Sequence, residues 1–135
     1  MRPLFLVPAL ALLAGIWLSP MGTGLAGFPA HMVRHMTLVA LAAPLLVLGL
    51  PGISAKLAFN PLIAAVLEFV VVWAWHLPQA HGLARLTGAG FVAEQTAFLA
   101  AGVLIWASCL SARIPLAGAG GLLLTSMHRT LLGAL

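Results

Sequence analysis

Long apolar stretches, interrupted only by short clusters of proline and glycine, constrain the fold of this chain more than any other feature. A helix needs about 20 apolar residues to cross the hydrocarbon layer of a bilayer. Segments that approach this length lie at residues 4–19, 31–50, 57–77, 88–110 and 116–135. Inside a bilayer, only helices and closed barrels satisfy their own backbone hydrogen bonds. We therefore predict an all-α fold, a polytopic transmembrane helix bundle of about five spans that forms a single domain over residues 1–135.

The composition supports a membrane protein and excludes several functions. Of the 135 residues, 63% are hydrophobic and 6% are charged, whereas about a quarter of the residues in soluble domains are charged. The Lys and Arg residues stand singly, as expected for topology signals and lipid contacts, so no nucleic-acid binding is expected. The single cysteine, Cys109, excludes an intramolecular disulfide. No nucleophile stands with a base, and we expect no enzyme activity.

Segments rich in turn-forming residues separate the apolar runs, and they read SPMGTGLAGFP, PGIS, PQAHG and SARIP. Proline and glycine often end or restart helices, so we expect loops at these places. The first run is short, begins after Arg2 and is followed by Gly24-Leu25-Ala26, a small-x-small pattern that signal peptidase could accept. It is therefore either a retained span or a cleaved signal, and the next segment starts outside in both cases.

The positive charges predict the direction of the helices, because Lys and Arg are enriched at cytoplasmic ends. With the N-terminus in the cytoplasm, Arg2, Lys56 and Arg113 fall at cytoplasmic ends, whereas Arg85 lies outside. This orientation brings all the histidines to the outer half of the membrane. They are His31, His35, His76, His81 and His128.

The hexapeptide HMVRHM opens the second predicted span with metal-capable side chains. Residues four apart share a helix face, so His31 and His35 point together, and Met32 and Met36 form a neighbouring stripe. Imidazole and thioether ligands together suit copper, and Cu(I) in particular. The alternative interpretation is structural, because methionine fills apolar gaps and histidine is common at a membrane boundary.

Polar side chains also occur in the later predicted spans. Met127 and His128 repeat the Met/His pairing, and His76 stands in the sequence WAWHLP. Glu94 lies about six residues into the fourth span, where an acid is costly unless it is paired or faces the bundle interior. His81 lies in an expected loop, and we interpret it as a solvated residue.

Glu68 falls near the middle of the third predicted span, where an ionised carboxylate is most costly. We expect it to be protonated or to pair with an arginine such as Arg129 or Arg34. Cys109 is expected at the cytoplasmic end, opposite the histidines, as a packing residue.

Several fragments stand in an order that resembles a known family. These are HMVRHM with the following AAPLLVLGLP, then WHLP, an acidic residue ahead of FLAAGVLIW, and finally TSMHRTLLGAL. Together they resemble the polytopic CtaG-type cytochrome c oxidase assembly factors, which are distinct from the single-span copper chaperone that has shared the name. The resemblance covers residues 28–135 and implies a bacterial inner-membrane protein that helps to make a haem-copper oxidase and handles copper.

The residues of this chain that match the family motifs are His31, His35, His76, Glu94 and His128. In the fourth motif the family commonly shows Glu-His, whereas this chain has Glu94-Gln95. Family members are usually longer, with more spans. The expected partners are haem-copper oxidase subunits and the lipid bilayer.

These observations lead to three hypotheses of function. The first is copper handling during oxidase assembly, with Cu(I) as the expected form of the metal. The second is a structural subunit or scaffold of a respiratory oxidase complex that binds no metal. The third, less favoured, is a haem b electron carrier, since histidines on different helices can ligate iron from both sides. The candidate metal ligands are His31, His35, His76, His128, Met32, Met36, Met127 and Glu94.

Overall fold

The computed structural model describes residues 1–18 and 28–134, and every regular element in these ranges is a helix. In chain order they are α1 (Pro3–Leu18), α2 (Phe28–Thr37), the π-helical turn η1 (Leu38–Ala42), α3 (Ala43–Gly49), α4 (Pro51–Leu57), α5 (Pro61–Trp75), α6 (Pro78–Leu86), α7 (Gly88–Leu110) and α8 (Pro115–Ala134). The prediction of an all-α fold is confirmed. The expected cleavage pattern Gly24-Leu25-Ala26 lies outside the described residues.

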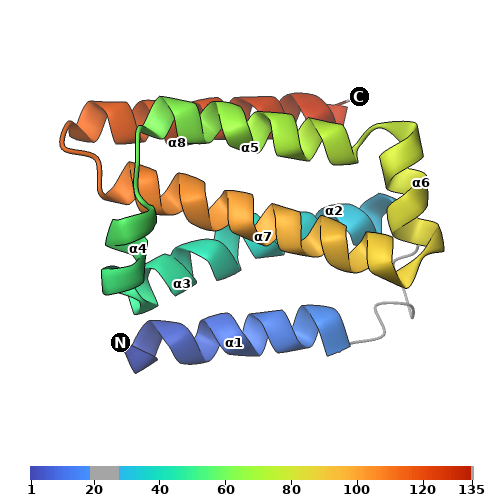
Figure 1. Ribbon diagram of the computed structural model, residues 1–135, viewed down its shortest axis with the longest axis horizontal. Helices are drawn as coiled ribbons and strands as arrows, with labels where there is room; N and C mark the ends of the chain where they lie inside the picture. The colour runs from blue at the N-terminus through green and yellow to red at the C-terminus, as the bar shows by residue number, and fades with distance from the viewer. Residues whose placement is uncertain (19–27, 135) are drawn as a thin grey trace.

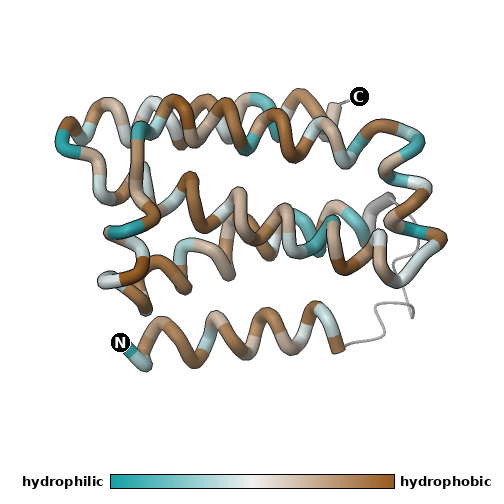
Figure 2. Tube along the Cα trace, in the orientation of Figure 1, coloured by the Kyte–Doolittle hydropathy of each residue, from teal (hydrophilic) through white to brown (hydrophobic). Residues whose placement is uncertain are grey.

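The long helices run side by side along the longest axis of the molecule (Figure 1). α1, α5 and α8 run in one direction, α2 to α3 and α7 run in the other, and the short helices α4 and α6 lie at opposite ends. α7 is the central helix, because it packs against α3, α5, α6 and α8. Figure 2 shows that α1, α5 and α7 are apolar along most of their length. The molecule is thus a polytopic helical bundle, as predicted.

Two of the described helices are long and apolar enough to cross a membrane. One is the stretch His31–Gly49 of the continuous helix that α2, η1 and α3 form, and the other is α7. A third candidate span consists of α4 and α5 together, although they are bent by 87° at the break between them. α1 is a shorter apolar helix. By length and composition, the described residues therefore supply two or three spans, fewer than the expected five.

Two of the expected loops are short helices. PGIS lies in α4 and PQAHG lies in α6, and each helix begins with a proline, Pro51 or Pro78. Proline is favoured at the first helical position because its missing N–H needs no partner there. These prolines therefore start helices, and the expectation of loops at PGIS and PQAHG was wrong. Similarly, α5 begins at Pro61 after the cap residue Asn60, whose side chain accepts hydrogen bonds from two backbone N–H groups of the first turn.

Small residues let the central helices approach closely. A Cβ atom added at Gly102 of α7 would lie 3.1 Å from the Ala43 side chain and 3.2 Å from that of Val39. A Cβ atom added at Gly118 of α8 would collide with the backbone carbonyl of Cys109. Between helices in lipid, close packing of this kind replaces much of the hydrophobic driving force. The bundle is therefore tightest around α7, which holds α2 to α3 on one side and α8 on the other.

Candidate metal centre

Four histidines and one glutamate converge at the end of the bundle where α2 begins and α5 ends. His31 and His35 lie on α2, His76 directly follows α5, His81 lies on α6, and Glu94 lies in the second turn of α7. Because α2 and α7 run antiparallel to α5, the starts of the first two helices meet the end of the third. The up-and-down topology therefore gathers residues that are up to 63 positions apart in the sequence.

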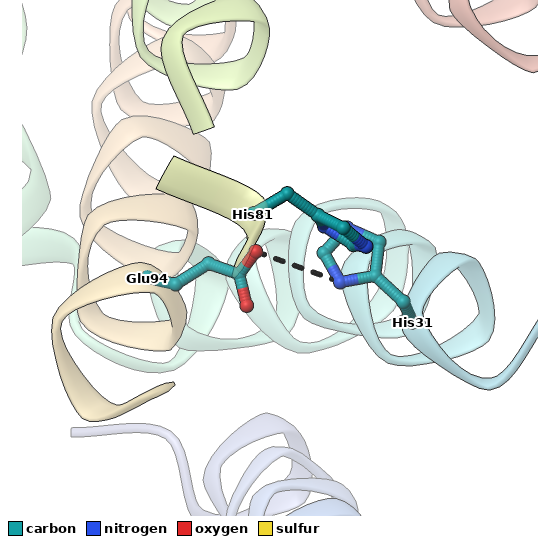
Figure 3. A group of neighbouring side chains, drawn as sticks. All are labelled: His31, His81 and Glu94. Carbon is teal, nitrogen blue, oxygen red and sulfur yellow. Dashed lines mark ion pairs between the residues drawn. The ribbon is translucent and has the colours of Figure 1, made fainter. Parts of the chain in front are cut away.

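His31 is the central member of this group. Its Nδ1 atom lies 3.5 Å from Glu94 Oε1, and its Nε2 atom lies 3.2 Å from His76 Nε2. The His81 ring is 4.8 Å from the His31 ring, measured between centroids. Figure 3 shows His31, His81 and Glu94 directed toward one another from three different helices. One ligand atom from each of these three side chains lies within 4.8 Å of the others, so the group could hold a metal ion.

The hydrogen bond of His76 to the backbone decides which of its nitrogens can bind a ligand. His76 Nδ1 lies 2.6 Å from the Val72 carbonyl oxygen, which only accepts, so the Nδ1–H donates. Burial lowers the pKa of His76, against the opposing effect of this hydrogen bond, and favours the neutral ring. The Nε2 lone pair of His76 therefore faces His31 Nε2. This contact needs either a proton on His31 or a cation shared by the two rings.

The spacing and surroundings of His31 and His76 fit a shared cation. Two nitrogen ligands at about 2.0–2.1 Å from a tetrahedral ion are separated by roughly 3.3–3.4 Å, close to the 3.2 Å between the two Nε2 atoms. Metal-binding histidines also place their second ring nitrogen against a carbonyl or carboxylate oxygen. Val72 supplies such a group to His76, and Glu94 supplies one to His31.

His35 lies deeper in the bundle and has unsatisfied polar atoms. It is 0% exposed and stacks on Phe98, with ring centroids 4.2 Å apart and an interplanar angle of 16°. Neither of its ring nitrogens makes a hydrogen bond within the described part of the chain. A buried polar group without a partner costs about 1–3 kcal/mol. Since the His76 ring is 5.5 Å away, a ligand bound between these rings would relieve that cost.

The methionines that were candidate ligands lie at more accessible positions. Met36 is 38% exposed and Met127 is 61% exposed, whereas Met32 is half-buried. Met127 lines an apolar groove of about 790 Å³ between α5 and α8. The donor atoms that the structure gathers are therefore imidazole nitrogens and a carboxylate oxygen. Imidazole suits copper as well as zinc, iron and nickel, so this set alone does not select Cu(I).

His128 belongs to a second polar cluster, between α5 and α8. Glu68 Oε2 accepts a hydrogen bond from Thr125 at 2.7 Å and lies 3.3 Å from His128 Nε2. Arg129 donates to Glu68 Oε1 and forms an ion pair with it. Arg129 and Arg34 were the arginines expected as partners of Glu68, and Arg129 is the one that pairs with it. His128 belongs to this network, whereas the other four histidines lie together in the candidate metal centre.

Sequence reasoning missed His81 as a member of the centre. It was placed in a loop, but it lies on α6 with its ring against His31. The signal that could have located α6 is Pro78 as a helix start. Gln95, which stands where the resemblance leads one to expect histidine, is buried, and its Nε2 donates a long hydrogen bond to Glu94 Oε2 at 3.5 Å.

Comparison with known proteins gave one family. The model of the cytochrome c oxidase caa3 assembly factor family (Caa3_CtaG) matches residues 2–135. No curated protein and no solved structure matches the chain. The matched range contains both the candidate metal centre and the Glu68 network.

Proposed function

This chain belongs to the cytochrome c oxidase caa3 assembly factor family, and we propose that it handles copper while the oxidase is assembled. The observation that carries the proposal is the pair of facing Nε2 atoms of His31 and His76, 3.2 Å apart. His81 and Glu94 close the group around them.

In this proposal, imidazole nitrogens of His31, His76 and His81 hold the copper ion. The Glu94 carboxylate supplies either a further ligand or the acceptor that orients the His31 ring. His35 lies behind them as a buried imidazole with two unsatisfied nitrogens. Bound copper is the cargo, and the residues of the chain bind and release it without catalysing a reaction. The exposed side chain of Met36 offers the soft sulfur that Cu(I) prefers during arrival or departure.

We also propose that the chain lies in the bacterial inner membrane with its N-terminus in the cytoplasm. The distribution of Lys and Arg supports this orientation, and it places the metal centre on the outer side. The proposed recipient is a subunit of the haem-copper oxidase whose assembly gives the family its description.

A scaffold that binds no metal is the second candidate, and Gln95 favours it. An amide stands where the resemblance leads one to expect a further imidazole, and it already contacts Glu94. Such a scaffold would copurify with oxidase subunits whether or not copper was present. The haem b alternative is disfavoured by the direct contact of His31 and His76, because a porphyrin ring would have to lie between two axial histidines.

The proposal is tested by measuring copper bound to the detergent-solubilised chain, purified under reducing, oxygen-free conditions. We expect close to one copper per chain, lost in His31→Ala and in His76→Ala. Met127→Ala is the matched control, because Met127 is exposed and lies on α8, which contributes no ligand to the proposed centre. Copper retained by both histidine variants, or absent from the unmodified chain, would reject the proposal and favour the scaffold.

A further inference from the structure

The helix that carries His31 and His35 contains a π-helical turn. In η1, the backbone N–H of Ala43 donates to the carbonyl of Leu38, five residues back. An α-helix makes this bond to the residue four positions back, so the wider turn accommodates one extra residue. The turn begins only three residues after His35. It therefore sets the rotation of α2, with its histidines, relative to α3.

α7 contacts this turn through a polar group. The indole Nε1–H of Trp106 donates to the Val39 carbonyl at 2.7 Å, across 67 positions of sequence. In a π-turn the Val39 carbonyl would accept from the N–H five residues on, but that residue is Pro44, which has no N–H, so the carbonyl needs another donor. Val39 is also fully buried, and its side chain packs closely on the site of Gly102. Trp106 and Gly102 thus fix the same residue of the turn to the central helix.

The rotation of α2 decides where its histidines point. Each residue of an α-helix turns the chain by roughly 100°. If the same residues formed a regular α-helix, α2 would rotate by about this angle relative to α3. His35 would then leave Phe98, on which it stacks, and His31 would leave Glu94. The native arrangement of the histidines therefore depends on the extra residue staying in the turn.

We propose that Trp106 is a positioning residue of the metal centre. Its hydrogen bond to the Val39 carbonyl holds the π-turn, and the π-turn directs His31 and His35 toward the ligands on α5, α6 and α7. This proposal rests on the proposed function in one respect: its copper-binding test requires that the chain binds copper. Its geometric part is tested without metal.

The first test uses Trp106→Phe, which keeps an aromatic ring and removes the N–H donor. We expect this variant to bind copper at least tenfold more weakly than the unmodified chain. Deleting Leu41, a residue of the turn that is 52% exposed, removes the extra residue and leaves both helix halves in their native rotation. The deletion alone should therefore keep copper, and combining it with Trp106→Phe should restore the copper that Trp106→Phe loses. General damage to packing would instead make the combined variant worse.

The second test measures the rotation directly, in the full chain without copper. Cysteines replace Val33 on α2 and Leu123 on α8, both exposed, in a background where Cys109 is alanine. Spin labels on these cysteines report their separation by pulsed electron paramagnetic resonance. We expect Trp106→Phe to shift the distance distribution by several ångströms, and the additional deletion of Leu41 to return it. An unchanged distribution in Trp106→Phe, or no return in the combined variant, would overturn the proposal. If the unmodified chain bound no copper, the proposed function would fail, whereas these distances would still decide the role of Trp106.

Discussion

Replacing Arg129 by methionine should destabilise the bundle strongly, because it leaves a buried carboxylate without its cation. Glu68 is 0% exposed and is paired with Arg129, with Thr125 and His128 as its other polar partners. Removing one partner of a buried ion pair costs about 3–5 kcal/mol. At 1.4 kcal/mol per factor of ten, the unfolding equilibrium constant should rise by roughly 150-fold to 4,000-fold.

The assay is unfolding by sodium dodecyl sulfate in mixed micelles, followed by circular dichroism. The matched variant is Glu68→Leu combined with Arg129→Met, which removes both charges. Replacing a whole buried pair by apolar residues is often close to neutral, so the double variant should be more stable than Arg129→Met alone. The difference between the variants isolates the cost of the unpaired carboxylate.

A loss below about 1 kcal/mol in Arg129→Met would refute this reasoning. That value is typical of solvent-exposed ion pairs, and hydrogen bonds between membrane helices average only about 0.6 kcal/mol. Such a small loss in Arg129→Met would mean that water reaches Glu68 and that α5 and α8 pack less tightly than the structure indicates.

Two further predictions concern how the helices start and pack. Gly118→Ala should lower the free energy of unfolding by about 1–3 kcal/mol, because the added Cβ would collide with the Cys109 carbonyl. Gly120→Ala should be neutral, because nothing lies within 4 Å of its added Cβ. Equal stabilities of the two variants in the same micelle assay would contradict this prediction. Asn60→Ala should lower the free energy of unfolding by about 1 kcal/mol, because it removes two hydrogen bonds to the first turn of α5. Asn60→Asp keeps a side-chain acceptor at this position and should be as stable as the unmodified chain. A helix that tolerated alanine and aspartate equally would show that the cap contributes nothing.

Apolar length located the long helices well. α7 begins and ends at the residues expected for the fourth segment. The continuous helix of α2, η1 and α3 begins at Phe28, three residues before the second segment, and ends at Gly49, one residue before that segment ends. Both segments are long and apolar, so burial and backbone hydrogen bonding favour the same bounds. The bend between α4 and α5 was not predictable in this way, because hydropathy averages over the break at residues 58–60.

Spacing alone predicted that His31 and His35 share a face, and their rings lie 6.4 Å apart. The position of His81 was missed because α6 has nine residues, too few for an apolar period to be read with certainty. The π-turn was also missed. Pro44 follows the turn and lacks a backbone N–H, so it indicates an irregular helix at this place. The contacts of Val39 with α7 that accompany the π-turn are tertiary and leave no local pattern in the sequence.

The gathering of the histidines also has a consequence for the order in which the protein is made. Its side chains come from residues 31 to 94, so the ribosome has synthesised all of them before it reaches α8. α8 packs through a different set of contacts, which includes the ion pair of Arg129 with Glu68 and the close approach of Gly118 to Cys109. The histidines can therefore be brought together before α8 is made, whereas the ion pair of Glu68 with Arg129 can form only afterwards.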